Sequence, residues 1–164
     1  MTVTSWRIVK KKYVTHAFDG EGARVNGGRW NSVGISVIYT ARSVSLAILE
    51  MLVHGAAPLV SNYSLIPVSF DSTLLLDVDV NSLPAGWHKY PAPAVTIAIG
   101  NKWFQSRRSV IFRVPSAVVA SESNYLLNPK HPDFGAIVVG DPTDLPLDPR
   151  LTRWSESTED TEGA

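Results

Sequence analysis

Glu50 is the single carboxylate inside the apolar segment VSLAILEMLVH, residues 44–54, and it is the first candidate for chemistry. A carboxylate that loses its water is strongly destabilised unless another group pairs with it. His54 lies four residues later on the same side of a helix and could supply that pairing. One interpretation is an interior acid held by a local hydrogen bond. The other is a carboxylate that faces a cleft and stabilises positive charge in a reacting ligand, and position in the sequence does not choose between them.

Arg29 occupies a glycine-rich turn, NGGRWNSVG, residues 26–34. Glycines at 27, 28 and 34 permit positive φ and let a ligand approach the backbone closely. A guanidinium in such a turn can make a two-pronged contact with a phosphate or carboxylate. The alternative is a hairpin loop whose surface arginine stacks on Trp30. The pattern is neither a dinucleotide-binding GxGxxG fingerprint nor a phosphate loop with lysine.

Tyr39 ends the segment that precedes the Glu50 helix, so it could meet Arg29 and Glu50 where loop, strand and helix converge. A strand tyrosine usually belongs to the core, whereas a tyrosine in a cleft can stack on a planar ligand.

Farther along, Ser116 and Asn124 share a loop-rich region. Ser116 lacks the G-x-S-x-G context of a hydrolase nucleophile, and turn formation is the usual role of such a serine. The histidines lack metal-ligand spacing, so we assign no metal; they are His16, His54, His88 and His131.

Alternating and β-branched patterns predict the elements that must position these residues. Ser43 is expected to cap a helix that ends at Gly55. Because this helix is apolar on all its faces, it is expected to be buried on most sides. Pro93 precedes a second predicted helix, 94–106. Segment 115–134 is too rich in turn formers to be one element. Strands are expected within 1–13, in ISVIYTA up to Ala41, and at 62–70, 73–78, 109–114 and 135–140.

The whole chain has 164 residues, which fits one domain. Its 15 Lys and Arg balance 15 Asp and Glu, so nothing predicts direct binding to nucleic acid or to an anionic membrane. No apolar run approaches the roughly 20 residues of a membrane span, and the N-terminus lacks the apolar core of a signal peptide. With no cysteine, a cytoplasmic location is the default expectation. The acidic tail, 155–164, is expected to be disordered.

Four segments together resemble the RES domain: GGRWNSVGISVIYTARSVSLAILEMLVH, IGNKWF, RVPSAVVASESNYLLNPKHPDF and DPRL. The resemblance runs from Trp6 to Leu151. The arginine, glutamate and serine that name the family match Arg29, Glu50 and Ser116. The resemblance implies an α+β single domain, residues 1–154, with an ADP-ribosyltransferase-like fold of the diphtheria-toxin type. A central mixed β-sheet core flanked by helices is therefore expected.

The same resemblance implies a function, because RES proteins are toxins of Xre–RES toxin–antitoxin pairs that act on NAD. It implies that NAD is a substrate, degraded by hydrolysis or phosphorolysis, or used to transfer ADP-ribose to a protein. The implied catalytic residues are Glu50, Arg29 and Ser116. The implied NAD-binding residues are Arg29, Tyr39, Trp30, His54 and Asn124.

The expected partner is an Xre-type helix-turn-helix antitoxin, which would carry any DNA contact, and by analogy a homodimer is also expected. A catalytically silent module that binds the antitoxin is the alternative from another class. Retention of Arg29, Tyr39, Glu50 and Ser116 argues against it. A ribonuclease is disfavoured by the neutral charge and by the lack of a clustered basic, aromatic surface.

Overall fold

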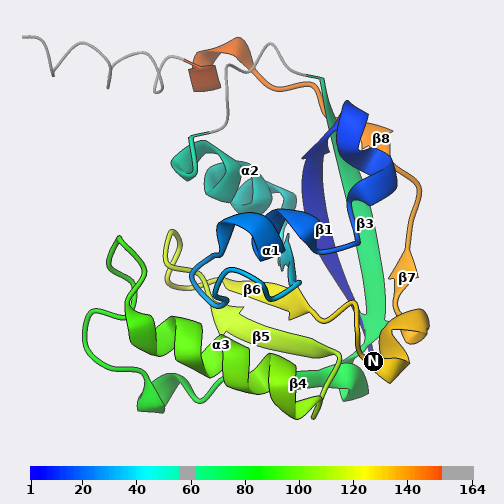
Figure 1. The fold of residues 1–164 in the computed structure, drawn as a ribbon. Helices are drawn as coiled ribbons and strands as arrows, with labels where there is room; N and C mark the ends of the chain where they lie inside the picture. Colours follow the sequence, from blue (N-terminus) through cyan, green and yellow to red (C-terminus); the bar gives the residue numbers. More distant parts are fainter. Residues whose placement is uncertain (56–61, 153–164) are drawn as a thin grey trace, which may run out of the picture.

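The computed structural model describes residues 1–55 and 62–152. In these residues one curled sheet is accompanied by three α-helices and several short 3₁₀ turns (Figure 1). The helices are α1 (Glu21–Asn26), α2 (Val44–Val53) and α3 (Ala94–Ser106). The strands are β1 (Thr2–Lys10), β2 (Ile38–Ala41), β3 (Tyr63–Asp71), β4 (Leu75–Asp77), β5 (Ile111–Pro115), β6 (Ser123–Leu127), β7 (Val138–Val139) and β8 (Thr143–Asp144).

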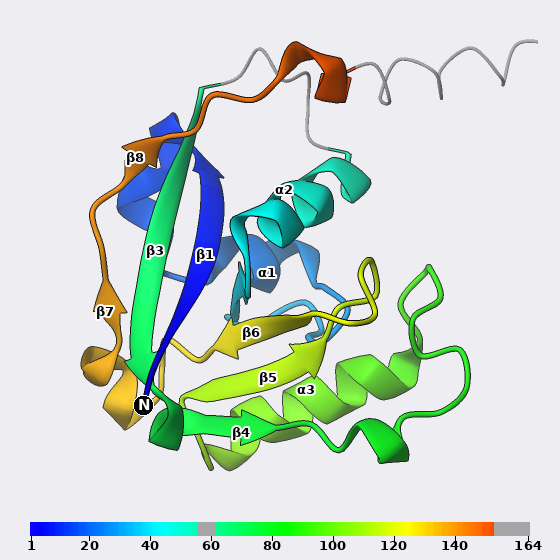
Figure 2. The same ribbon diagram turned by 180° about the vertical axis from the view of Figure 1, so that it is seen from behind.

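The strand order is β4-β5-β6-β2-β1-β3-β7, with β8 also pairing with β3. Every pairing is antiparallel except that between β4 and β5, so the sheet is mixed as expected. Figure 2 shows β1 and β3 running upright while β4, β5 and β6 run crosswise beneath them. The α+β fold class predicted from the sequence is confirmed.

The main core lies between these two parts of the sheet. Phe70 of β3 packs edge-on against Tyr125 of β6, with ring centroids 5.4 Å apart, although two strands, β2 and β1, lie between them in the sheet order. Such contacts require the sheet to fold over on itself. The other face of β5 and β6 is covered by α3, whose Trp103 stacks on Phe112 at 5.2 Å.

Most elements lie where the patterns predicted them. Ser43 caps α2, because its hydroxyl oxygen accepts from the backbone N–H of Leu46 at 3.1 Å, and α3 begins directly after Pro93. Three helices or strands were missed, α1, β6 and the short β8. The strand β6 was hidden in a region rich in turn formers, and its last three residues are all buried, so it shows no apolar-polar alternation.

The prediction that α2 is buried on most sides is wrong. Leu46 and Ala47 pack on β1 and β2, but Leu49 is 41% exposed and Val53 is 62% exposed. The helix contacts the sheet through one face only, so its apolar outer face remains in solvent.

No helix among residues 1–55 and 62–152 is long and apolar enough to cross a membrane. The tail assigned to 155–164 lies outside the described residues.

Candidate active site

The Glu50 carboxylate is held by two side chains that lie far away in the sequence. Its Oε1 accepts from Ser116 Oγ at 2.9 Å and from Asn124 Nδ2 at 2.6 Å. Ser116 follows β5 and Asn124 belongs to β6, so two neighbouring strands present donors to a helix that packs above them. Hydrogen bonds to a charged acceptor are among the stronger ones in proteins. Glu50 is therefore fixed in orientation while remaining partly exposed.

Ser116 is itself immobilised by the turn that follows it. The side chain is buried, and its oxygen accepts from the backbone N–H groups of Val118 and Val119, both at 3.0 Å. Glu122 closes the same loop and accepts from the Ser43 hydroxyl at 2.8 Å, which ties the loop to the start of α2. The serine hydroxyl is used to orient a carboxylate, which agrees with the absence of a nucleophile motif around it.

His54 is a much weaker partner for Glu50 than the sequence suggested. Its Nε2 lies 3.9 Å from Glu50 Oε2, and the histidine side chain is 71% exposed. The compensation for the carboxylate comes instead from Ser116 and Asn124. Among the described residues, Oε2 has only this long contact with His54, and that leaves it available to a ligand.

Tyr39 lies at the centre of a second network. Its hydroxyl donates to Asn31 Oδ1 at 2.7 Å and accepts from the backbone N–H of Trp30 at 3.2 Å. Burial raises the pKa of Tyr39 well above its ordinary value, although the Trp30 amide and the nearby Arg29 charge oppose the rise. The phenol stays neutral, and it connects β2 to the turn that carries Arg29.

The glycines of this turn have specific structural roles. Gly27 has φ of 70° and Gly34 has φ of 96°, values that side chains rarely adopt. At Gly28, an added Cβ would lie 2.6 Å from the Tyr39 hydroxyl and 2.8 Å from Asn31 Oδ1. The absence of a side chain at position 28 therefore allows Tyr39 to reach the turn.

Helix α3 holds the turn from the opposite side. An added Cβ at Gly100 would meet the Trp30 carbonyl oxygen at 1.7 Å, so the helix and the turn are in direct backbone contact. Asn101 Oδ1 accepts from the Ser32 N–H at 3.0 Å, and its Nδ2 donates to the Ser32 hydroxyl at 2.9 Å. The IGNKWF segment, residues 99–104, thus packs against and hydrogen-bonds the glycine-rich turn, with 69 positions between Ser32 and Asn101.

Arg29 reaches from this turn to an irregular loop before α3. Its Nη1 donates to the carbonyl oxygens of Trp87 at 2.8 Å and Lys89 at 2.9 Å. Partial burial lowers the pKa of Arg29, and the negative charge of Glu50 opposes that effect. The guanidinium is therefore in the electrostatic neighbourhood of that carboxylate. Trp30 does not stack on Arg29 as a surface residue; it is 3% exposed and packs in the core with Trp87 and Trp103 nearby.

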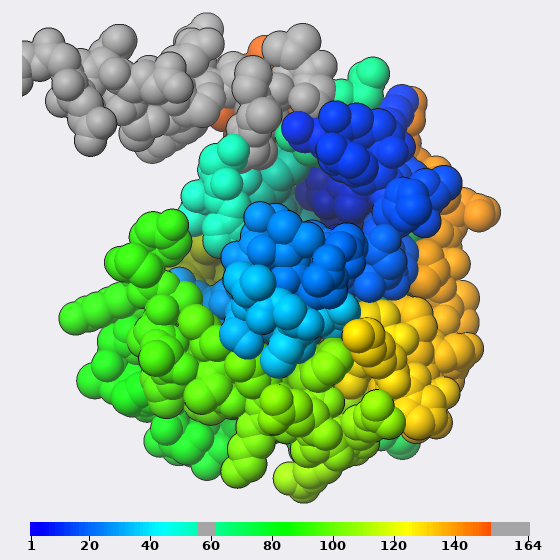
Figure 3. Space-filling view, in the orientation of Figure 1, coloured from blue at the N-terminus to red at the C-terminus, as the bar shows by residue number. Residues whose placement is uncertain are grey.

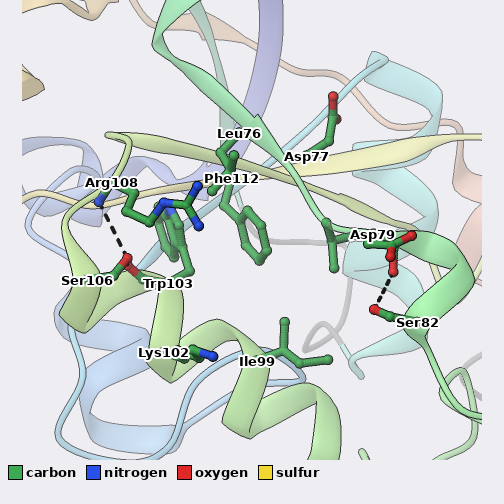
Figure 4. A pocket seen from close by; sticks show the side chains of 11 residues that line it. Leu76, Asp77, Asp79, Ser82, Ile99, Lys102, Trp103, Ser106, Arg108 and Phe112 are labelled. Atoms are coloured by element: carbon green, nitrogen blue, oxygen red, sulfur yellow. Dashed lines mark hydrogen bonds between the residues drawn. The ribbon is translucent and has the colours of Figure 1, made fainter.

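The surface above these residues is recessed. Figure 3 shows a hollow bordered by α2, by the loop before α3 and by the segment around α1, with the loop between β5 and β6 at its floor. A separate cavity of about 300 Å³ lies between α3 and the β4–β5 edge (Figure 4). Glu50, Ser116, Asn124, Tyr39 and Arg29 do not line that second cavity, whose wall includes the stacked rings of Trp103 and Phe112. The elements that carry Glu50, Arg29 and Ser116 border the first hollow: α2, the segment around α1 and the loop after β5.

The sequence profile of the RES domain matches residues 4–148. The chain belongs to the RES domain family. It is 38% identical over 161 residues to the "Prs ADP-ribosylating toxin" of Sphingobium sp. (strain YBL2), covering 93% of this chain and 99% of that toxin. It is also 38% identical to the "Toxin Res" of Yersinia enterocolitica, covering 89% of this chain and 97% of the relative.

The RES fold is also seen in a solved structure. The crystal structure of the MbcT–MbcA toxin–antitoxin complex of M. tuberculosis contains a similar chain, with a TM-score of 0.75 and 20% sequence identity. The similarity covers 96% of this chain and 90% of that one. At this identity the likeness concerns the fold.

Within this RES domain, the predicted site residues fall into two groups, one around Glu50 and one around the Arg29 turn. Glu50, Ser116 and Asn124 are joined by hydrogen bonds, and Tyr39 is bonded to the turn of Arg29 through the Trp30 amide. Trp30 is a buried support and His54 a peripheral neighbour. Sequence reasoning missed Asn31, which is buried and holds Tyr39; its place in the glycine-rich turn was the available signal. No group of three metal-binding side chains occurs among the described residues.

Proposed function

We propose that this RES domain is a toxin that cleaves the nicotinamide–ribose bond of NAD and so depletes the cell of NAD. The observation that carries the proposal is the Glu50 carboxylate. One oxygen is fixed by Ser116 and Asn124, and the other has only a long contact with His54 among the described residues, while the charge of Glu50 acts on Arg29. A carboxylate fixed in this way suits stabilisation of a positive charge that develops on a ligand during reaction.

The chemistry follows from the leaving group. NAD carries its positive charge on the nicotinamide ring, and when the bond to ribose breaks, the bonding electron pair leaves with neutral nicotinamide. The ribose then acquires oxocarbenium character, as in glycoside hydrolysis. Glu50 Oε2 would face that charge or orient a ribose hydroxyl. Water or phosphate then bonds to the anomeric carbon, and an attacking water releases its proton. No strong general acid is required.

The remaining residues fit the binding of NAD. Arg29 retains donors beyond Nη1 that can contact the diphosphate or a ribose. Asn124 Oδ1 is buried and has no hydrogen-bond partner among the described residues, so it can accept from a ligand N–H or O–H. Tyr39 offers an aromatic surface to nicotinamide, His54 borders the entrance, and Trp30 acts by packing beneath the turn. No metal has a role in this proposal.

Transfer of ADP-ribose to a protein is a second candidate, and one observation favours it. The Sphingobium relative, whose name describes an ADP-ribosylating toxin acting on Prs, aligns with this chain over almost its full length. The bond that breaks is the same and only the acceptor differs.

An Xre-type helix-turn-helix antitoxin is the proposed partner, and the toxin–antitoxin context of the structural neighbour supports it. A homodimer and a cytoplasmic location complete the proposal.

The test is incubation of purified, antitoxin-free protein with NAD, with and without inorganic phosphate, followed by mass analysis of the products. Free ADP-ribose identifies hydrolysis, and ADP-ribose 1″-phosphate identifies phosphorolysis. A mass gain of one ADP-ribose on a protein in an added cell extract, with no free product, identifies transfer. Intact NAD in all three conditions contradicts the proposal and leaves the silent antitoxin-binding module.

A further inference from the structure

Arg7 carries a buried guanidinium that the mechanism above does not use. It lies on β1, one residue after Trp6, which is the only β1 residue in register with β2, opposite Ala41. Burial lowers the pKa of Arg7 to about 10, with the charge of Asp19 opposing the fall. Its Nε is buried without a hydrogen-bond partner among the described residues. A cation held in this costly environment needs a structural or functional reason.

The reason is visible in what the guanidinium binds. Arg7 Nη1 donates to the Tyr39 carbonyl oxygen at 2.7 Å. The backbone pairing between β1 and β2 is limited to the position of Trp6 and Ala41, and Tyr39 lies two residues before Ala41 in β2. The arginine side chain therefore bonds the β2 backbone beyond the point where the strand pairing ends. Phe18 borders the guanidinium, 5.9 Å from its carbon to the ring centroid.

The anchored tyrosine is the residue that holds the Arg29 turn. From Tyr39 the connection continues through its hydroxyl to the Trp30 amide and Asn31, the two residues that follow Arg29. The Glu50 group is built differently, from α2, β5 and β6, and Arg7 makes no hydrogen bond to it. Arg7 thus supports the Tyr39 and Arg29 part of the site and makes no hydrogen bond to the Glu50 group.

We propose that Arg7 is a positioning residue that fixes Tyr39, and through it the Arg29 turn, for the binding of NAD. This inference rests on the proposed function. It specifies that loss of Arg7 weakens substrate binding more than it slows the chemical step, because the Glu50 carboxylate and its donors stay in place. General destabilisation has the opposite signature: it reduces the folded fraction, which lowers the apparent kcat and leaves KM unchanged.

The experiment compares Arg7→Met, Arg7→Lys and Thr40→Val in the full chain. Thr40 is the matched control, because its buried hydroxyl bonds Ser5 Oγ at 2.9 Å in the same junction of β1 and β2, and its side-chain hydrogen bonds go to Ser5 and Tyr125 rather than to Tyr39. We expect Arg7→Met to raise KM for NAD about tenfold, with kcat per folded molecule within about threefold of wild type, the size expected for one lost hydrogen bond to a charged group. Arg7→Lys should recover part of the loss, and Thr40→Val should leave KM unchanged.

A second readout does not depend on activity. Hydrogen exchange at the amides of Trp30 and Asn31 should accelerate in Arg7→Met and remain at the wild-type rate in Thr40→Val. Unchanged KM together with unchanged exchange at these amides overturns the role of Arg7, as does a fall in kcat alone that follows the folded fraction. Absence of NAD cleavage by wild type overturns the proposed function instead, and exchange then still decides whether Arg7 anchors the turn.

Discussion

The two charged groups of the site, Glu50 and Arg29, are fixed in contrasting ways. Glu50 lies on a regular helix and is held by side chains from two paired strands, with one oxygen committed and one open. Arg29 lies in an irregular turn, and its Nη1 donates to the carbonyl oxygens of Trp87 and Lys89 in another irregular loop. The Glu50 carboxylate is preorganised by the fold, whereas the Arg29 guanidinium is anchored to a loop.

This difference assigns different duties to the two groups. Preorganisation is most valuable where charge develops during reaction, because the environment then needs no rearrangement. A guanidinium that bridges two loops is suited to recognising the ligand and bringing the loops around it. The comparison therefore predicts that changes at Glu50 act mainly on kcat and changes at Arg29 mainly on KM.

The largest effect is expected for Glu50→Gln. The amide oxygen of glutamine can still accept from Ser116 and Asn124, so the fold and the local geometry should persist while the negative charge is lost. We expect kcat to fall about a thousandfold, in the range measured when a group that stabilises a transition-state charge is removed. Initial rates of nicotinamide release measure this, with circular dichroism and thermal unfolding as controls. A rate within threefold of wild type removes Glu50 from the mechanism.

Arg29→Lys should have the next largest effect. Lysine keeps the charge but lacks the planar fork that can bond a loop carbonyl and an anionic ligand together. KM for NAD should rise about tenfold or more, with a smaller change in kcat. Arg24→Lys is the control, because Arg24 is exposed and its guanidinium pairs with Glu21 three residues away rather than with a site residue. Equal changes in the two variants would show that Arg29 has no special role.

Ser116→Ala tests the fixing of the acid. It removes one of the two donors to Glu50 Oε1 and an acceptor for two backbone amides, while Asn124 keeps its contact. We expect kcat to fall about tenfold with KM little changed. Ser109→Ala, which removes a hydroxyl bonded to Trp103 Nε1 away from the site, provides a comparison for stability loss. A rise in KM without a fall in kcat would contradict the division of duties.

His54→Asn should have the smallest effect, within about threefold in kcat and KM. The ring is exposed, and its 3.9 Å contact with Glu50 is long and open to solvent. Kinetics across pH 5.5 to 8 provide the check, since an essential histidine would leave a titration in this range that disappears in the variant. A loss as large as that of Ser116→Ala would place His54 among the groups that fix the acid.

Much of this arrangement could be predicted from the sequence. The cap at Ser43, the helix after Pro93 and the strand that contains Tyr39 follow from local patterns, and these place Glu50, Gly100 and Tyr39 on known elements. Glu50 stood out because an acid inside an apolar helix requires a partner. The glycine-rich turn likewise pointed to Arg29.

The partners themselves could not be predicted, because they depend on tertiary contacts. Asn124 bonds Glu50 across 74 positions of the chain, and its strand β6 has no alternation to reveal it. The partner that the sequence did suggest, His54, was nearest in the chain but is not nearest in space. Arg7 was unremarkable as one basic residue in a strand, because its role depends on where the pairing of β1 and β2 ends.

The most direct test of the central claim is release of nicotinamide from NAD by the purified protein, followed by proton nuclear magnetic resonance. Hydrolysis, phosphorolysis and transfer all share this product, so the measurement does not depend on the acceptor. With phosphate and a cell extract present, the account predicts that nicotinamide appears as NAD disappears, and that Glu50→Gln is about a thousandfold slower. Intact NAD with wild-type protein, or equal release by Glu50→Gln, would contradict it.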